Sequence, residues 1–367
     1  MKPDPLCNVP YIYSSIGADG RYRDCCATSP NIRKFEADFT SWWTGPEMTQ
    51  LRDSLHSDQL PQSCRRCKYE EDVGGISFRT TNLKDYPIVD YTMKYPMQYQ
   101  IGFSSLCNLA CWSCSELYSS RIADDKIKLG LLPVTFLSEV DKFQLAWPSL
   151  KASILESYSH HEIVHINIFG GEPTINTDVI EFLTELNDRN LTERTRLEFF
   201  TNCQTLQEKF VQAIATKKWN YLIVLASIDA YGTKNEWVRY GSTWKNVDKN
   251  LRKLATIANY TKIMAVMSTL TVGASQRLKE YAKEVGVDIG FQYATTPAFL
   301  DLQSWDGDKF IKNSSDPECQ LMINSLGSNP VQGTKKALRE YIERFAAVRP
   351  LSLESLDKTL YDAIFKD

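Results

Sequence analysis

The sequence predicts an α/β protein, because apolar runs of strand length alternate with longer amphipathic segments. Six such runs follow one another from about residue 96, and helix-like stretches such as 177–190 and 206–218 separate them. The runs cover residues 99–105, 164–170, 196–202, 221–229, 262–271 and 288–294. Strands separated by helices pair in parallel, in either a doubly wound sheet or a barrel. Both architectures place their sites at the carboxyl ends of the strands.

Composition divides the chain into three predicted parts. Residues 1–92 are rich in Cys, Trp, Pro and Gly and have weak periodicity, which indicates a small module stapled by metal. Residues 93–304 carry the six strands, with a mostly helical insertion at 116–162 between the first two. Residues 305–367 are expected to form a helical extension.

Charge and hydropathy exclude several classes of partner. The chain has 42 basic and 45 acidic side chains, a formal net charge of -3 that offers no field for nucleic acid. It has neither the apolar core of a signal peptide nor an apolar stretch long enough for a membrane span. We therefore expect a cytoplasmic protein with neither nucleic acid nor a membrane as partner. In that reducing compartment, ten cysteines favour metal binding or catalysis over disulfides.

The stretch LCNLACWSCS at 106–115 places Cys107, Cys111 and Cys114 on one short loop after the first predicted strand. A [4Fe-4S] cluster is normally held by four thiolates, so three cysteines leave one iron open to a substrate or cofactor. Zinc is an alternative, although Cys-x3-Cys-x2-Cys is not a usual zinc-ribbon spacing. Three buried cysteines at the start of a helix are a further, purely structural alternative.

The stretch CNLACWSC resembles the CxxxCxxC loop of radical S-adenosylmethionine (SAM) enzymes, and the six βα units resemble their partial (β/α)6 TIM-like barrel. The likeness extends over most of residues 96–300. It implies that Cys107, Cys111 and Cys114 hold a [4Fe-4S] cluster whose remaining iron binds SAM. It also implies that the reduced cluster cleaves SAM to methionine and a 5'-deoxyadenosyl radical, which abstracts a substrate hydrogen. An external electron donor of the flavodoxin or ferredoxin type is then expected.

Two further strand ends resemble the family's cofactor-binding motifs. Gly170-Gly171-Glu172-Pro173 looks like the GGEP motif, in which the glycines allow close approach of the backbone and Glu172 accepts from the SAM ammonium. Asn202 resembles the asparagine of the TNG strand end, which faces the SAM ribose, although Cys203 replaces the glycine.

The fourth predicted strand leads to three more candidates. Ser227 and Arg239 resemble the serine and arginine that hold the SAM ribose and carboxylate in relatives with extra clusters. Asp229 also follows this strand, and a carboxylate at such an end could accept a proton from a substrate radical, so it is the catalytic candidate. Many members place an aromatic residue near the adenine, directly before the third cysteine. Here Ser113 holds that place and Trp112 comes one residue earlier.

The N-terminal part is similar to the cysteine-rich twitch or SPASM extension, which holds an auxiliary iron-sulfur cluster in the family. That extension usually follows the barrel, whereas here it precedes it. A hairpin-like turn at 12–23 separates Cys7 from Cys25, and Cys64 and Cys67 form a CxxC corner, so four thiolates can converge on a second [4Fe-4S] cluster. Cys26 competes with Cys25, and a zinc site with four cysteines needs the same ligands.

The sequence thus favours a radical SAM enzyme that acts on a small polar molecule or a peptide. An auxiliary cluster suits removal of an electron, so a two-electron oxidation or a cross-link is the expected reaction. The competing hypothesis is a non-catalytic zinc or iron-sulfur protein with a structural or redox-sensing role. A purely structural site does not require the strand-end residues Glu172, Asn202, Ser227 and Arg239, so these distinguish the two hypotheses.

Overall fold

An eight-stranded sheet runs through the molecule in the order β2-β1-β3-β4-β5-β6-β7-β8. The computed structural model describes residues 4–27, 35–57, 60–72, 75–87, 94–307, 310–311, 314–326 and 329–366. Neighbouring strands pair in parallel, except that β1 and β2 pair antiparallel. The strands are β1 (Tyr13–Ile16), β2 (Tyr22–Arg23), β3 (Gln98–Gly102), β4 (Val164–Phe169), β5 (Thr195–Thr201), β6 (Tyr221–Ser227), β7 (Tyr260–Met267) and β8 (Asp288–Tyr293).

The six predicted strands are β3 to β8, in the predicted order, so the α/β class is confirmed. The two additional strands lie in the N-terminal part. β1 pairs in parallel with β3, with Tyr13 opposite Gln98 and Ile16 opposite Ile101. The N-terminal part therefore continues the sheet instead of only standing beside it. The division into three domains stays a prediction, and its first boundary, between residues 92 and 93, lies outside the described residues.

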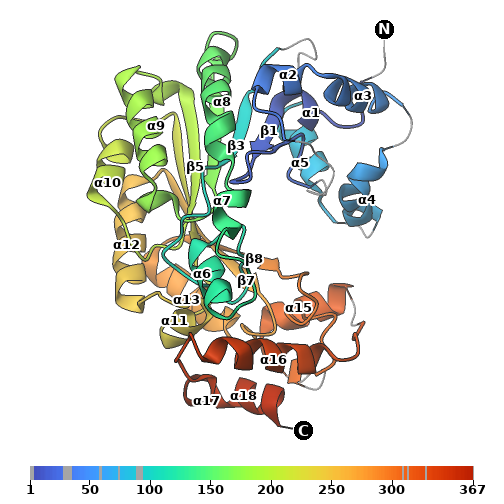
Figure 1. The fold of residues 1–367 in the computed structure, drawn as a ribbon, viewed down its shortest axis with the longest axis vertical. Coiled ribbons are helices and arrows are strands. Elements are labelled where there is room, and N and C mark those ends of the chain that lie inside the picture. Colours follow the sequence, from blue (N-terminus) through green and yellow to red (C-terminus); the bar gives the residue numbers. More distant parts are fainter. Residues whose placement is uncertain are drawn as a thin grey trace.

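Helices of the central part connect the strands and cover one side of the sheet, as α8, α9, α10 and α12 show in Figure 1. The insertion predicted at residues 116–162 forms α6, α7 and α8. The helices are α6 (Ser120–Lys128), α7 (Phe136–Val140), α8 (Phe143–Ser157), α9 (Thr177–Asp188), α10 (Glu208–Ala215), α11 (Thr233–Val238), α12 (Trp244–Ile257) and α13 (Ser275–Val285).

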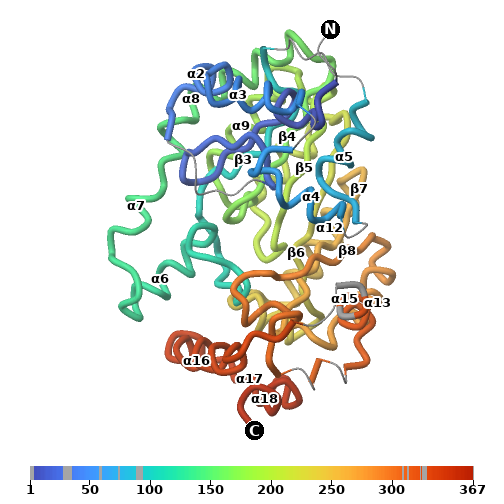
Figure 2. Tube along the Cα trace, turned by 90° about the vertical axis from the view of Figure 1, so that its right-hand side faces the viewer, coloured from blue at the N-terminus to red at the C-terminus, as the bar shows by residue number. Residues whose placement is uncertain are grey.

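The two ends of the chain form separate groups of helices at opposite ends of the molecule (Figures 1 and 2). The N-terminal helices are α1 (Val9–Ile12), α2 (Phe39–Trp43), α3 (Pro46–Ser54), α4 (Arg65–Asp72) and α5 (Phe78–Asp85). The predicted helical extension forms α15 (Pro317–Leu326), α16 (Thr334–Ala346), α17 (Leu353–Leu356) and α18 (Lys358–Phe365). Among the described residues, no helix combines the length and the apolar character that crossing a membrane requires.

Alternation along β4 separates the two faces of the sheet. Val164, Ile166 and Ile168 are fully buried in the main core under the helices, whereas His165 and Asn167 are half-buried on the other face. The helices contribute apolar faces to the same core, and α9 begins at Asn176, whose side chain accepts from two backbone amides of the first turn. A rigid sheet therefore fixes the strand ends that carry the site.

His165 should make the protein sensitive to acid. Burial, and then the charge of Arg196, lower the pKa of His165 to about 4, from an ordinary value of about 6.5. The unfolded chain takes up this proton first, so the stability that depends on neutral His165 is present above pH 6.5 and is lost as pH falls towards 4. We expect His165→Gln to reduce the fall in unfolding midpoint between pH 7 and pH 4.5, measured by urea denaturation. His160→Gln, at an exposed position, is the control, and an equal effect of both substitutions would contradict the prediction.

Candidate functional site

The cysteine loop lies at the carboxyl end of β3, and backbone hydrogen bonds fix it to the segment after β6. The amide of Ala110 donates to the carbonyl of Tyr240 at 2.8 Å, and the amide of Trp112 donates to that of Val238 at 2.9 Å. The residues after β6 thus hold the middle of the loop in an extended path. The amide of Leu109 also points at the Cys107 sulfur, 3.5 Å away. Amide groups near a sulfur stabilise negative charge on it.

All three thiols of this loop are free; Cys111 is buried, and Cys107 and Cys114 are half-buried. Burial raises the pKa of Cys107 and of Cys114 to about 12, and it raises the pKa of Cys111 as well. Each neighbouring thiolate would raise these values further, because the loop brings like charges together. The metal-free loop is therefore neutral at pH 7, and a metal that binds here must displace protons.

The GGEP segment meets the cysteine loop backbone to backbone. Gly170 and Gly171 have φ of 77° and 53°, in the left-handed region, and a Cβ on Gly171 would stand 2.3 Å from the carbonyl oxygen of Leu106. The next amide, of Glu172, donates to that same carbonyl at 2.8 Å. Only glycine permits this approach, so the predicted reason for the glycine pair agrees with the geometry.

The Glu172 carboxylate lies inside the protein, where it joins the ends of β4 and β5. Its Oε1 accepts from the amide and hydroxyl of Thr174, at 3.2 and 2.7 Å, and from the Thr201 hydroxyl at 2.8 Å. Its Oε2 accepts from the amide of Asn202 at 2.7 Å. Burial raises the pKa of Glu172, and these hydrogen bonds oppose the rise. Oε2 accepts only this one hydrogen bond from the described residues, so it keeps capacity for a further donor.

Asn202 reaches the cysteine loop through its side chain. Its Nδ2 donates to Asn108 Oδ1 at 2.8 Å and lies 3.9 Å from the Cys107 sulfur. The following residue, Cys203, has φ of 58°, a conformation that favours glycine. Cys203 therefore adopts a backbone conformation that glycine reaches more easily. Sequence reasoning missed Asn108, although its position inside the cysteine motif could have drawn attention to it.

Arg239 and Asp229 form a buried ion pair beside Cys111. Arg239 Nε lies 2.9 Å from Asp229 Oδ2, Nη2 donates to Oδ1 at 3.1 Å, and Nη1 lies 3.9 Å from the Cys111 sulfur. Asp229 Oδ1 also accepts from the amide of Val266 at 2.9 Å. Burial lowers the pKa of Arg239, but the charge of Asp229 raises it, so the guanidinium stays charged. Asp229 Oδ1 thus accepts two hydrogen bonds, whereas Oδ2 lies beside the guanidinium without a hydrogen bond among the described residues, an arrangement that favours positioning of Arg239 over proton transfer.

Ser227 and Trp112 are the two remaining residues considered from the sequence, and they lie in different surroundings. Ser227 ends β6 half-buried, and its side chain makes no hydrogen bond within the described part of the chain. Trp112 is 2% exposed, and its ring stacks on Trp237 at 5.2 Å between centroids. Packing thus already occupies the Trp112 ring.

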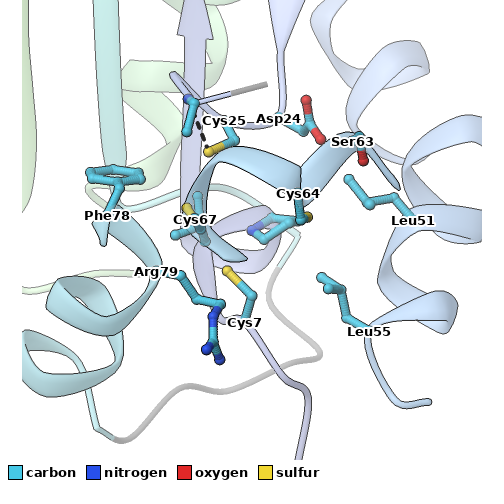
Figure 3. A pocket seen from close by; sticks show the side chains of 13 residues that line it. Cys7, Asp24, Cys25, Leu51, Leu55, Ser63, Cys64, Cys67, Phe78 and Arg79 are labelled. Carbon is cyan, nitrogen blue, oxygen red and sulfur yellow. Dashed lines mark hydrogen bonds between the residues drawn. The ribbon is translucent and has the colours of Figure 1, made fainter. Parts of the chain in front are cut away.

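Four cysteines of the N-terminal part line one cavity of about 430 Å³, part of it open to solvent. Figure 3 shows the side chains of Cys7, Cys25, Cys64 and Cys67 around this common space, to which Arg79 also contributes. Cys7 precedes α1, Cys25 follows β2, and the other two lie at the start of α4. The structure therefore brings together the four thiols that the sequence predicts as one ligand set.

Cys26 lies outside this cavity. It is exposed, whereas Cys25 faces the cavity and accepts from the amide of Ala27 at 3.3 Å. Burial raises the pKa of Cys7 to about 12 and also raises that of Cys64. Arg79 supplies a cation nearby: its Nη1 donates to the carbonyl of Leu6 at 2.8 Å, and Nε donates to Glu71 at 3.0 Å. The geometry favours Cys25 over Cys26 as the fourth ligand.

The two groups of cysteines lie at different ends of the strands. Cys107, Cys111 and Cys114 follow the carboxyl end of β3. Cys25 follows β2, which runs antiparallel to β1, so it lies beside the amino end of β1. Among the described residues, no three His, Cys, Asp or Glu side chains are arranged to hold a single metal ion. A four-iron cluster takes one thiolate per iron, so its ligands need not meet at one point.

A second cavity, of about 330 Å³ including space open to solvent, lies beside the cysteine loop. Asp19, Arg23 and Asp141 give it charge, and Leu117 and Tyr118, which follow the loop, give it an apolar wall. Arg23 pairs with Asp19 at 3.0 Å. The space therefore offers both polar and apolar contacts near the three thiols.

No protein family model matches the chain, and no curated protein matches it. Among solved structures, SuiB of Streptococcus suis with bound S-adenosylmethionine is similar at 15% identity and a TM-score of 0.40, over 78% of this chain. The chain spans 58% of the length of that SuiB chain. The enzyme anSMEcpe, with bound AdoMet and a peptide, has 18% identity and a TM-score of 0.38, over 67% of this chain and 65% of its own. TsrM of Kitasatospora setae, a radical S-adenosylmethionine methyltransferase with cobalamin and a [4Fe-4S] cluster, has 13% identity and a TM-score of 0.32, over 42% and 29%.

Replacing Gly171 should separate the GGEP segment from the cysteine loop. Gly171→Ala adds both a left-handed backbone penalty and a clash with the Leu106 carbonyl, so we expect a loss of about 3 kcal/mol in the free energy of unfolding. Gly130→Ala is the control, because Gly130 has φ of 69° but no atom within 4 Å of the added Cβ. It should cost only about 1 kcal/mol. Equal losses for the two variants, measured by denaturant unfolding, would contradict a role for the close contact.

Proposed function

We propose that the protein is a radical SAM enzyme. One observation carries the proposal: the three-thiol loop is in direct contact with residues from two further strand ends and from the segment after β6. The amide of Glu172, the side chain of Asn202 and the guanidinium of Arg239 all reach the loop. A structural metal loop needs no such arrangement, since its ligands alone would hold it.

The donor set fits a [4Fe-4S] cluster with one iron left open. Cys107, Cys111 and Cys114 would hold three irons, and the loop amides and Arg239 would stabilise the thiolates. When bound, the reduced cluster supplies the electron that cleaves SAM to methionine and a 5'-deoxyadenosyl radical. Glu172 Oε2, Asn202 and Ser227 would bind the polar groups of SAM. Arg239 would offer its guanidinium to the SAM carboxylate, held in orientation by Asp229.

The four-cysteine cavity would hold a second [4Fe-4S] cluster. Burial of its thiols and the adjacent Arg79 suit a charged, shielded group. A closed zinc site would use the same four thiolates, so the metal is identified by its spectrum and not by its ligands. A second cluster would accept an electron, which suits a two-electron oxidation or a cross-link.

The substrate would be a small polar molecule or a peptide. The mixed cavity, with Arg23 and Asp141 on its polar side and Tyr118 on its apolar side, would receive it, because Ser105 and Leu117, which flank the cysteine loop in the sequence, also line this cavity. An external flavodoxin or ferredoxin would supply electrons.

Anaerobic reconstitution with iron and sulfide tests the proposal. We expect about eight irons per chain, and release of 5'-deoxyadenosine after addition of SAM and dithionite. Cys111→Ala should abolish this release, because it removes one of three ligands to the cluster that binds SAM. Cys319→Ala, which alters a buried cysteine of α15, should leave it unchanged. Release of 5'-deoxyadenosine by the Cys111→Ala protein at the native rate would overturn the proposal.

Two adjacent cysteines test the second site. Cys25→Ser should halve the iron content to about four per chain, whereas Cys26→Ser should leave it near eight, because only Cys25 lines the cavity. Elemental analysis and electron paramagnetic resonance measure the result. If the unmodified protein contains four irons and one zinc, the cluster on the three-cysteine loop stands, and the four-cysteine site holds zinc instead of a second cluster. The opposite response of the two variants would assign Cys26 as the ligand.

A further inference from the structure

The C-terminal helices hold the second half of the cysteine loop. Trp112 lies there between two ligands, and its carbonyl accepts from the Tyr341 hydroxyl of α16 at 3.2 Å. Its ring lies 5.6 Å from the Tyr341 ring and 6.1 Å from that of Phe345, both edge-on. Trp112 therefore belongs to a second hydrophobic core, separate from the main core under the helices of the sheet. This second core consists largely of residues beyond position 300. A segment more than 200 positions away in the sequence thus contacts the backbone of the loop.

Arg349, just after α16, contacts the same tryptophan. It is 2% exposed, and its guanidinium carbon lies 4.5 Å from the Trp112 ring centroid and 4.5 Å from that of Phe345. Its Nε donates to Asp125 Oδ2 at 2.9 Å, and Asp125 lies in α6, which follows the cysteine loop. Within the described part of the chain, its two terminal nitrogens are buried and make no hydrogen bond. A buried guanidinium with two unpaired N–H groups is costly unless a nearby negative charge compensates it.

The cysteine loop therefore stands between two buried arginines, each paired with an aspartate. Arg239 approaches Cys111 from the segment after β6, and Arg349 approaches Trp112 from the C-terminal part. In the metal-free protein the two aspartates balance the two arginines. Three thiolates with a bound cluster would add the negative charge that the unpaired N–H groups of Arg349 can face.

We propose that Arg349 is a positioning residue of the cysteine loop, which fixes Trp112 and supplies, with Arg239, the positive charge that a cluster on this loop requires. The proposal rests on the proposed function, since it assumes that Cys107, Cys111 and Cys114 hold iron. The C-terminal part then belongs to the site, because Arg349, which follows α16, places its positive charge beside the cysteine loop.

Two substitutions test this role, one that removes the positive charge of Arg349 and one that removes the negative charge of Asp125. Arg349→Met removes the cation and should make the midpoint potential of the cluster on this loop more negative, because the reduced cluster loses a stabilising charge. Asp125→Asn removes the opposing anion and should make the potential less negative. Arg349→Lys keeps the charge and should leave the potential near the native value. Arg344→Met, at an exposed position on the last turn of α16, is the control. Redox titration followed by electron paramagnetic resonance measures all four.

The direction of the shifts in midpoint potential distinguishes an effect of charge from general damage to the fold. Shifts of the same sign in Arg349→Met and Asp125→Asn, or none in either, would overturn the electrostatic part. If the unmodified protein bound no iron, the proposed function and this part would fail together. If it bound iron and cleaved SAM while the variants kept native potentials, only this inference would fail.

A measurement without metal tests the positioning part. Hydrogen exchange at the amides of Ala110 and Trp112, both bonded to the segment after β6, should be faster in Arg349→Met than in Arg344→Met. Iron in the reconstituted Arg349→Met protein should also be lost about 10-fold more readily to a chelator. Unchanged exchange and retention would show that Arg349 does not position the loop.

Discussion

The site depends on the gathering of three thiols on one short loop, with Cys111 buried and Cys107 and Cys114 half-buried. A thiolate in such surroundings is unfavourable, and three together are more so, because burial and mutual repulsion both favour the neutral form. A loop that carries charge there needs fixed donors and cations around it. The amide of Leu109, the ion pair of Arg239 with Asp229, and that of Arg349 with Asp125 meet this need from three directions. Most polar contacts of the site follow from this requirement.

The same requirement explains why the strand ends meet so closely. Parallel pairing sets the ends of β3 to β6 side by side, and glycine at 171 lets the end of β4 touch the loop that follows β3. Glu172 then joins β4 to β5 through Thr201 and Asn202. Because these contacts are made by backbone and short side chains, a small displacement of one strand end would disturb all of them. Rigidity of the sheet is therefore part of the site.

The features that could be predicted from the sequence are those encoded within single short segments. The alternating strands β3 to β8 and the cysteine spacing are visible in single segments, so the fold class and the first ligand set could be predicted. β1 has only four residues, all of them buried, so it has no alternation to detect. Asp125 and Arg349 are 224 positions apart, and no motif marks either of them. The catalytic role predicted for Asp229 came from its place at a strand end, and only the contacts with Arg239 and Val266 reveal that its carboxylate is engaged.

The order of the parts along the chain has a structural explanation in the pairing of β1. An edge strand of a parallel sheet accepts a further strand whether that strand comes earlier or later in the sequence, since the ladder depends on register alone. β1 joins β3 in this way, and β2 turns back so that Cys25 stands beside the amino end of β1, while the loop of Cys107 lies beyond the carboxyl end of β3. The hydroxyl of Tyr13, in β1, donates to Gln100 of β3 at 2.6 Å, and its ring lies 5.5 Å from that of Phe78, which lines the four-cysteine cavity. The sheet itself thus sets the distance between the two cysteine groups, and an N-terminal segment that precedes strands β3 to β8 is positioned by direct pairing with them.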